Sequence, residues 1–343
     1  MKRCLSSCVA VSARTVVFFV ALILFLTSCG RAATPEPTVS SRPLQVVATT
    51  TLIGDVVSVV GGDAIALTVL MPPGAEPHSF QPTPQDVARL SQADLVFING
   101  LGLEEALLSV LEGAVAAARI VAVSEGIPVL SGSDEPGHDD HEEHGEHEEH
   151  EGSTSTTETG DAHAHRVDPH TWMDPNNVIV WTRVIAEALA KADPDHRSDY
   201  EARAQAYIAE LEALDAWIRQ EVATIPPEKR LLVTDHLVFG YFARRYGFEQ
   251  IGAVIPGVSA VAEPSAQELA ALEEAIRAQG VPAILVGTTV NPRLAERVAR
   301  DTGTRLLTIY TDSLSEPEGP APTYLELMRY NVRTIVAGLR QER

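Results

Sequence analysis

Short aliphatic and β-branched runs alternate with helical segments along most of this chain, and this alternation occurs twice. In the first half the runs lie at residues 44–50, 65–71, 95–99 and 119–123, and helical patterns start at residue 52 and cover 84–91 and 103–118. Strands that alternate with helices indicate βαβ units, in which neighbouring strands are parallel. The first half therefore predicts an α/β lobe with a parallel sheet.

The second half repeats the pattern after one long uninterrupted segment. Further apolar runs lie at 231–234, 250–255, 283–286 and 305–309, with helical patterns at 238–246, 265–279 and 292–301. Residues 195–224 contain neither Gly nor Pro, and as a helix they would extend about 40 Å. Their position between the strand sets favours a connecting helix over one more packing helix. We expect two (β/α)4 lobes, 44–194 and 226–343, joined by a helix at 195–225.

The N-terminus has the pattern of an export signal. A basic segment precedes an apolar run at residues 16–26, which ends in Leu-Thr-Ser-Cys at Cys29. The run is short for a membrane span and typical of a secretory signal. Its end resembles a bacterial lipobox, although an ordinary signal peptide with a chance Cys is the alternative. We expect a signal peptide at 1–28, a lipidated Cys29, a tether at 29–43 and an extracytoplasmic, membrane-anchored protein.

One segment fits neither lobe. Twelve acidic residues and no Lys or Arg lie between Asp134 and Asp161. Residues 132–165 also hold seven of the eleven histidines, namely His138, His141, His144, His147, His150, His163 and His165. With almost no apolar side chains, the segment is predicted to be a disordered insertion. Its regular histidines favour weak, multi-site binding of a divalent metal over a merely solvated charged loop.

The overall charge restricts the classes of partner. The formal net charge is −21, which argues against nucleic acid or an anionic membrane surface as the ligand. Much of this charge belongs to the acidic insertion, so it describes that segment more than the lobes.

Three of the remaining histidines come after predicted strands. His170 lies in Val-Asp-Pro-His-Thr-Trp-Met-Asp-Pro, where two prolines restrict the backbone around it. His78 follows the second strand, His236 the fifth, and Asp312 the eighth. Ligands of open parallel sheets bind beyond the carboxyl ends of the strands, so we expect a site between the lobes. His196 is outside this pattern and is interpreted as a surface residue.

Three imidazoles and one carboxylate favour zinc, because manganese prefers more oxygen ligands. The sequence leaves open whether Asp312 would bind through one oxygen or two. The nearby acids have two open interpretations, orientation of the imidazoles or surface solvation; they are Asp168, Asp174, Asp235 and Glu263.

Together these motifs resemble the zinc/manganese-specific solute-binding proteins of ATP-binding cassette importers. The resemblance rests on Pro-Pro-Gly-Ala-Glu-Pro-His-Ser-Phe-Gln-Pro around His78, on the His170 and His236 segments, and on Tyr-Thr-Asp-Ser-Leu around Asp312. It implies two lobes joined by one long helix, a metal bound between them by these four residues, and delivery to a membrane permease. In that family a carboxylate at the third ligand position goes with manganese, so His236 favours Zn²⁺. It also implies a binding protein rather than an enzyme, and we expect a monomer without disulfides.

Three other functions remain as alternatives. The same transport role with Mn²⁺ or Fe²⁺ is the nearest. A secreted zinc hydrolase would also use histidines, but it needs an open coordination position, and no His-Glu-x-x-His sequence is present. A surface metal sink or adhesin would rest on the histidine-rich insertion alone.

Overall fold

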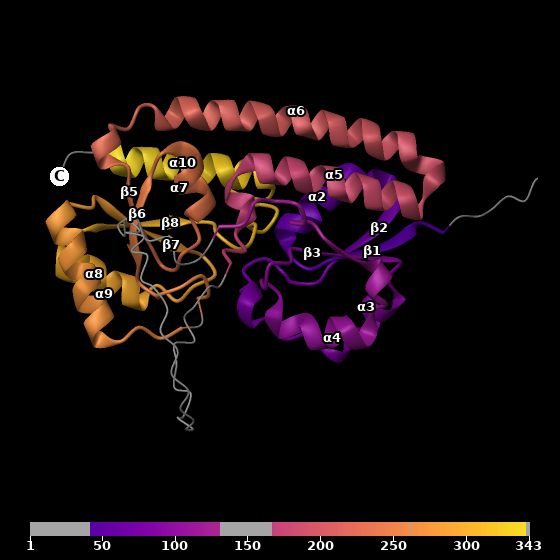
Figure 1. The fold of residues 1–343 in the computed structure, drawn as a ribbon, viewed down its shortest axis with the longest axis horizontal. Helices are drawn as coiled ribbons and strands as arrows, with labels where there is room; N and C mark the ends of the chain where they lie inside the picture. The colour runs from indigo at the N-terminus through magenta and orange to yellow at the C-terminus, as the bar shows by residue number, and fades with distance from the viewer. Residues whose placement is uncertain (1–41, 131–166, 261, 341–343) are drawn as a thin grey trace, which may run out of the picture. The chain divides into compact units, whose positions relative to one another are not determined.

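The computed structural model describes residues 42–130, 167–260 and 262–340. Two four-stranded parallel sheets form the centres of two lobes, in the orders β2-β1-β3-β4 and β6-β5-β7-β8 (Figure 1). The strands are β1 Leu44–Ala48, β2 Ile65–Val69, β3 Leu95–Ile98, β4 Ile120–Ala122, β5 Leu231–Thr234, β6 Glu249–Ala253, β7 Ala283–Gly287 and β8 Arg305–Ile309. The predicted α/β fold with two parallel-sheet lobes is confirmed.

The central strands are apolar because helices cover both faces of each sheet. Every residue of β3 and of β7 is buried, as expected for parallel sheets that have no solvated face. The two sheets share one strand order. In each sheet the connections diverge to opposite sides at one point, which lies between β1 and β3 in the first lobe and between β5 and β7 in the second. Loops beyond the carboxyl ends of the strands near such a point form the usual binding crevice.

Nine α-helices and two short 3₁₀ turns of the described chain matter for the site and its support. The α-helices are α2 Thr51–Gly61, α3 Pro84–Gln92, α4 Leu108–Ala114, α5 Pro175–Ala192, α6 Arg197–Val222, α7 Gly240–Tyr246, α8 Ala266–Gln279, α9 Arg293–Thr302 and α10 Tyr324–Arg340. The 3₁₀ turns η2 Pro77–Ser79 and η5 Thr171–Met173 lie beside the candidate ligands.

One helix prediction was wrong in its extent. The expected helix at 103–118 is reduced to α4, with the 3₁₀ turns η3 Glu105–Leu107 before it and η4 Ala117–Arg119 after it. Val115 ends α4 in an extended conformation, with φ −125° and ψ 132°. Its side chain is buried in the core beneath β3 and β4. Packing of this residue therefore overrides the helical propensity of the surrounding alanines.

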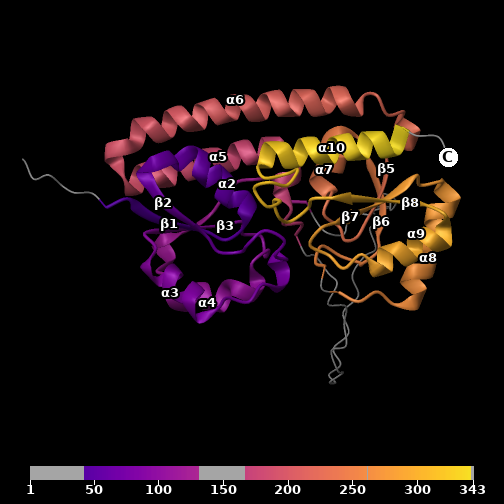
Figure 2. The ribbon, with the colours of Figure 1, turned by 180° about the vertical axis from the view of Figure 1, so that it is seen from behind.

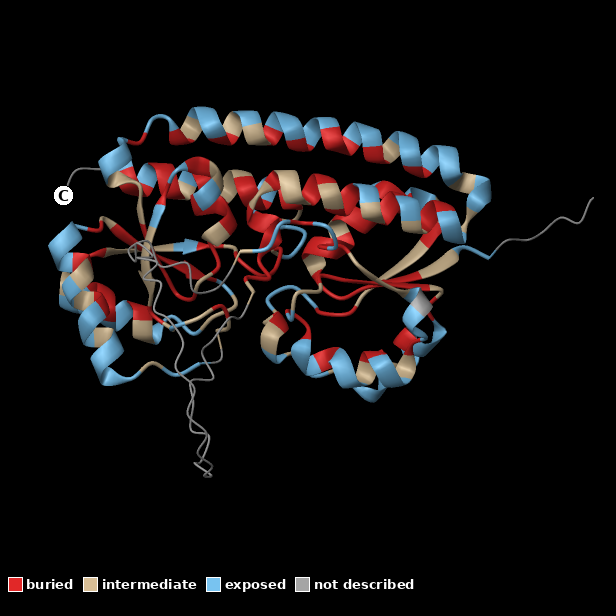
Figure 3. Cartoon of the chain, viewed as in Figure 1, coloured by how far each residue is buried: buried red, intermediate tan, exposed pale blue. Residues whose placement is uncertain are grey.

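A continuous hydrophobic core connects the lobes. It includes buried residues of α2 and α5 from the first lobe, α6, and α7 and α10 from the second. Each lobe also has a separate core on the other face of its sheet. This core lies under α3 and α4 in the first lobe and under α8 and α9 in the second. Figure 3 shows the buried faces of α5, α6 and α10 turned toward this shared core. The lobes are thus packed together through their helices.

The long connecting helix is α6, which has 26 residues. It packs against α2 and α5 of the first lobe and against α10 of the second, as Figure 2 shows. The predicted helix at 195–224 is confirmed, with the 3₁₀ turn Pro194–His196 in front of it. Within the described ranges, no helix combines the length and the apolar character that crossing a membrane requires.

Several predictions lie outside the described residues. These are the signal peptide at 1–28, the lipidation of Cys29, most of the tether at 29–43, and the histidine-rich insertion at 132–165 with its seven histidines. The three cysteines, Cys4, Cys8 and Cys29, also belong to this part of the chain.

Candidate metal centre

His78 reaches the site from the turn η2, which follows β2. The carboxylate of Glu76 caps this turn by accepting hydrogen bonds from the main-chain N–H groups of His78 (3.0 Å) and Ser79 (2.8 Å). Capping satisfies N–H groups that have no partner inside the turn. His78 is half-buried, whereas the other two clustered histidines are fully buried. Of the three clustered histidines, His78 is therefore the nearest to solvent.

His170 lies between the short strand pairing at Val167 and the turn η5. Asp168 accepts hydrogen bonds both from the main-chain N–H of His170 (2.9 Å) and from its ring Nδ1 (2.7 Å). Asn99, directly after β3, donates to the carbonyl of Pro169 at 3.0 Å. Because a carboxylate only accepts, Nδ1 carries the ring proton and the lone pair of Nε2 is available to a ligand.

His236 has a corresponding arrangement in the second lobe. Asp235 accepts from the main-chain N–H of His236 at 2.7 Å and from its Nδ1 at 2.8 Å. The second oxygen of Asp235 accepts from the main-chain N–H of Gly287, at the end of β7. Nε2 of His236 is buried and has no hydrogen-bond partner within the described ranges. The fold thus points one imidazole Nε2 from each lobe into the cluster.

Asp312 supplies a carboxylate from the segment that follows β8. Its side chain is fully buried, and Oδ1 has no hydrogen-bond partner among the residues described. Oδ1 lies 3.9 Å from Nε2 of His170 and 3.8 Å from Nε2 of His236. A buried polar atom without a partner is costly, so its position requires a ligand or a functional reason.

The four candidate side chains converge as expected from the sequence. Nε2 of His78 lies 3.3 Å from Nε2 of His170, and one nitrogen from each of the three histidines lies within 4.8 Å of the others. A tetrahedral site with Zn–N distances near 2.05 Å has ligand atoms about 3.3 Å apart. The His78–His170 edge matches this value, and the edges to Asp312 would need to shorten by about half an ångström. The cluster is therefore close to the size of a metal site.

Burial and mutual charge determine the protonation of the cluster. Burial, together with the charge of His170, lowers the pKa of His78 to about 4, and burial with the charge of His236 lowers the pKa of His170 to about 3. Burial also acts to lower the pKa of His236, but the charge of Asp312 and the hydrogen bond to Asp235 raise it to about 9. At neutral pH the His236 ring therefore carries two protons, one on Nδ1 toward Asp235 and one on Nε2. A cation that binds its Nε2 must displace this proton.

The nearby acids have different roles. Asp168 and Asp235 contact the imidazoles, as one of the two sequence-based interpretations proposed. Asp174 instead caps α5 by accepting from the main-chain N–H of Asn176 at 2.9 Å. Glu263 is exposed. His196 lies outside the cluster at the start of α6, where its partly exposed ring contacts Asp193 at 2.6 Å.

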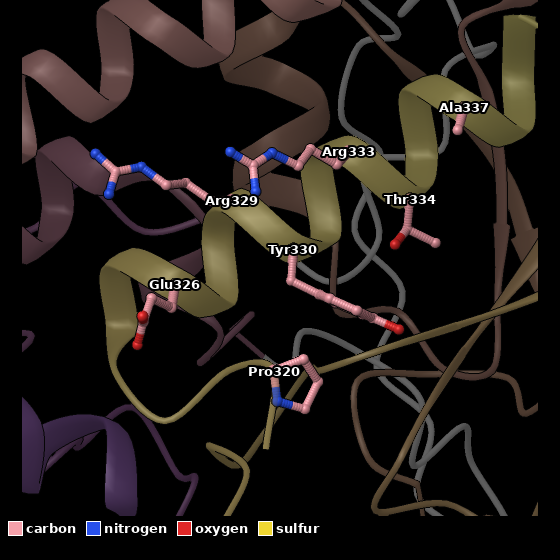
Figure 4. A pocket seen from close by; sticks show the side chains of 7 residues that line it. All are labelled: Pro320, Glu326, Arg329, Tyr330, Arg333, Thr334 and Ala337. Atoms are coloured by element: carbon pink, nitrogen blue, oxygen red, sulfur yellow. The ribbon is translucent and has the colours of Figure 1, made fainter. Parts of the chain in front are cut away.

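A cavity of about 400 Å³ adjoins the cluster. Its lining includes Glu76 and Ser79, which flank His78, and Thr289, which contacts Asp312. Another cavity of about 620 Å³ lies along α10 and includes none of the four candidate ligands (Figure 4). Its lining residues are Pro320, Glu326, Arg329, Tyr330, Arg333, Thr334 and Ala337. The smaller cavity is thus the one that borders the cluster.

Sequence reasoning missed three residues that support the cluster. Trp172 donates from Nε1 to the carbonyl of Thr311 at 2.8 Å, and its ring lies edge-on to His170. The hydroxyls of Thr289 and Thr311 both contact Asp312. The adjacency of Thr311 to Asp312 was visible in the sequence, but no pattern pointed to Thr289.

Comparison with known proteins shows the same fold and family. Residues 46–338 match the family described as "Zinc-uptake complex component A periplasmic". Among solved structures, the periplasmic zinc binding protein TroA from Treponema pallidum is similar, with a TM-score of 0.73 and 29% identity. That match covers 88% of this chain and 100% of the TroA chain.

Curated relatives are similar over nearly their whole length. The manganese-binding lipoprotein MntA of Halalkalibacterium halodurans is 31% identical over 327 residues, covering 94% of this chain and 98% of the relative. The iron-binding protein YfeA of Yersinia pestis is 30% identical over 330 residues, covering 95% of each. The chain therefore belongs to the zinc-uptake complex component A family, the metal-binding substrate-binding proteins of ATP-binding cassette importers.

Proposed function

We propose that this protein captures Zn²⁺ outside the cytoplasm and delivers it to the permease of an ATP-binding cassette importer. The ion would be bound by Nε2 of His78, His170 and His236 and by Oδ1 of Asp312. The observation that carries the proposal is a pair of buried atoms, Nε2 of His236 and Oδ1 of Asp312, which lie 3.8 Å apart and have no hydrogen-bond partner among the described residues. A divalent cation between them would satisfy both.

The donor set supports zinc as the cargo. Three imidazole nitrogens and one carboxylate oxygen suit Zn²⁺, which is commonly bound by four ligands in a tetrahedron. Mn²⁺ prefers carboxylate, carbonyl and water oxygens. The cluster offers it one carboxylate, while Asp168 and Asp235 are engaged with the Nδ1 atoms of His170 and His236.

Manganese or iron is the second candidate, and the relatives favour it. Relatives that are 30% or 31% identical to this chain are named a manganese-binding lipoprotein, an iron-binding protein and a manganese transporter lipoprotein. The transport role would be the same, since only the cargo differs. Members of this family are binding proteins rather than enzymes, so the zinc hydrolase alternative loses its support.

The proposed location follows from the N-terminal sequence. Residues 1–28 would be removed as a signal peptide, Cys29 would be lipidated, and residues 29–43 would connect the lipid to the lobes. Several relatives are named lipoproteins. The two lobes, 44–194 and 226–343, would then be held near the membrane, where a permease can receive the metal.

Calorimetry on the mature protein lacking residues 132–165 tests the ligand assignment. We expect one tight Zn²⁺ site per chain, because the four proposed ligands lie outside the deleted segment. His170→Ala should abolish tight binding. His196→Ala is the matched control, because His196 lies outside the cluster, and it should leave affinity unchanged. The assignment is wrong if the shortened protein has no tight site or if His170→Ala binds as before.

Competition between ions tests the choice of metal. Zn²⁺ is expected to displace Mn²⁺ or Fe²⁺ from the tight site at equal concentrations. Retention of Mn²⁺ or Fe²⁺ against equimolar Zn²⁺ would favour the second candidate and leave the transport role intact.

A further inference from the structure

The two carboxylate oxygens of Asp312 have different surroundings. Oδ2 accepts a hydrogen bond from the hydroxyl of Thr311 at 2.7 Å and another from the hydroxyl of Thr289 at 3.0 Å. Oδ1 is buried without a partner in the described part of the chain, and it lies 3.9 Å and 3.8 Å from Nε2 of His170 and His236. One oxygen is thus held by the protein, and the other faces the cluster.

The two hydroxyls fill the hydrogen-bonding capacity of Oδ2. An ionised carboxylate has about four lone-pair positions, two on each oxygen. A threonine hydroxyl has one hydrogen to donate, so Thr289 and Thr311 together occupy both positions on Oδ2. A cation at the cluster would therefore meet only Oδ1 unless one of these hydrogen bonds breaks.

The pairing of β7 with β8 places both threonines. Gly287 of β7 pairs with Ile309 of β8, and the main-chain N–H of Thr288 donates to the carbonyl of Ile309 at 3.1 Å. The segments after the two strands therefore run side by side, which brings Thr289 to Asp312 across 23 residues.

Gly287 makes room for this arrangement. A Cβ atom at this position would lie 2.3 Å from Oγ1 of Thr311, which is too close for any side chain. The absence of a side chain at Gly287 therefore lets the Thr311 hydroxyl stay on Oδ2, in the bend that follows β8.

We propose that Thr289 and Thr311 are specificity-determining residues that restrict Asp312 to one metal bond. The inference rests on the ligand set of the proposed function and specifies how that site selects its cargo. With one bond from Asp312, the site supplies three nitrogens and one oxygen, a four-coordinate set that suits Zn²⁺. Mn²⁺ favours six oxygen-rich positions and is left short of donors. If Oδ2 were freed, it would add a fifth donor atom, and the preference of the site for Zn²⁺ over Mn²⁺ would decrease.

The test is the full-length protein carrying Thr289→Val and Thr311→Val together, because valine keeps the shape of threonine and removes the hydroxyl. One equivalent of Co²⁺ reports the coordination number through its visible absorption. The native site should give the intense bands of four-coordinate Co²⁺, and the variant should give the weaker bands of higher coordination. The ratio of Zn²⁺ affinity to Mn²⁺ affinity should fall at least about tenfold, which is the usual effect of mutating a residue that hydrogen-bonds to a metal ligand.

Two controls separate this effect from general damage. Thr182→Val makes the same chemical change in α5, where the Thr182 hydroxyl donates to the Val178 carbonyl, and it should leave the spectrum and the affinity ratio unchanged. Thr289→Ser with Thr311→Ser keeps both donors and should behave as the native protein. If the double valine variant does not fold, Thr289→Val alone carries the test, because Thr289 is only half-buried.

The outcomes distinguish this inference from the proposed function. A native site with five- or six-coordinate Co²⁺, or an affinity ratio that the valine variants leave unchanged, overturns the role of the threonines while tight binding through His170 persists. Failure of the proposed function would give a different result. The native protein would then have no tight Zn²⁺ site, or it would have a tight site that His170→Ala does not weaken.

Discussion

The indole Nε1 of Trp172 donates a 2.8 Å hydrogen bond to the main-chain carbonyl of Thr311, which lies 139 residues further along the chain. Trp172 follows His170 by two positions, and Thr311 directly precedes Asp312. The bond therefore ties the segment that carries a first-lobe histidine to the segment that carries the second-lobe carboxylate. The carbonyl of Trp172 in turn accepts from the hydroxyl of Tyr324 at 2.7 Å, at the start of α10.

Trp172→Phe should weaken both folding and metal binding. The substitution leaves the carbonyl of Thr311 buried without a donor, which costs about 1–3 kcal/mol in the free energy of unfolding. Because the bond connects two ligand-bearing segments, the added stability conferred by Zn²⁺ should also shrink. Chemical denaturation with and without Zn²⁺ measures both effects.

Trp217→Phe provides a matched control for that experiment. Trp217 is half-buried on α6, and its ring lies under Arg333 rather than near the cluster. The control should lose less stability and keep its full stabilisation by Zn²⁺. Equal behaviour of the two variants would show that the Trp172 bond does not couple the lobes to the site.

Asp168→Asn should reduce Zn²⁺ affinity about 10- to 100-fold, the range typical of residues that orient a metal-binding imidazole. Asparagine can place an N–H group instead of an acceptor opposite Nδ1 of His170. It also lacks the carboxylate that makes the imidazole a stronger metal ligand. Calorimetry measures the change. Asp174→Asn is the control, because Asp174 caps α5 and asparagine caps equally well. An unchanged affinity in Asp168→Asn would contradict the positioning role.

Asp55 should make the stability of the fold depend on pH. It accepts from the main-chain N–H of Tyr324 at 2.8 Å. Burial raises its pKa to about 6, and the charge of Glu326 adds to this, against the lowering by the Tyr324 hydrogen bond. Between about pH 4 and pH 6 the unfolded chain ionises Asp55 while the folded protein retains its proton. Stability contributed by this group is therefore complete below pH 4 and is lost, by about 3 kcal/mol, as pH rises through 6.

Asp55→Asn tests this dependence, because asparagine keeps an acceptor for Tyr324 and cannot ionise. The free energy of unfolding of the variant relative to the native protein should increase by about 3 kcal/mol from pH 4 to pH 7. Denaturant titrations at several pH values measure it. Asp63→Asn, on an exposed turn in the same lobe, should follow the native profile. A constant difference for Asp55→Asn would contradict the assignment.

Local patterns predicted the strands, the connecting helix and the convergence of the four candidate ligands. The reason is physical: carboxyl ends of parallel strands share an edge, so His78, His236 and Asp312 needed only correct strand positions to be brought together. His170 was predictable because prolines restrict its turn.

The remaining features depend on distant packing that leaves no local pattern. Val115 ends a helix early because its side chain belongs to a core built from other elements. Thr289 reaches Asp312 only because β7 pairs with β8. Trp172 bonds to Thr311 only because the lobes are packed together. None of these contacts has a sequence period or motif from which it could be inferred.

The ligand set is tested most directly by diffraction at the zinc absorption edge from crystals of the protein with one equivalent of Zn²⁺. The account predicts one anomalous peak about 2.0–2.1 Å from Nε2 of His78, His170 and His236 and about 2.0–2.2 Å from Oδ1 of Asp312. A principal peak bound by other residues, or one that lacks any of these three histidines, would contradict it.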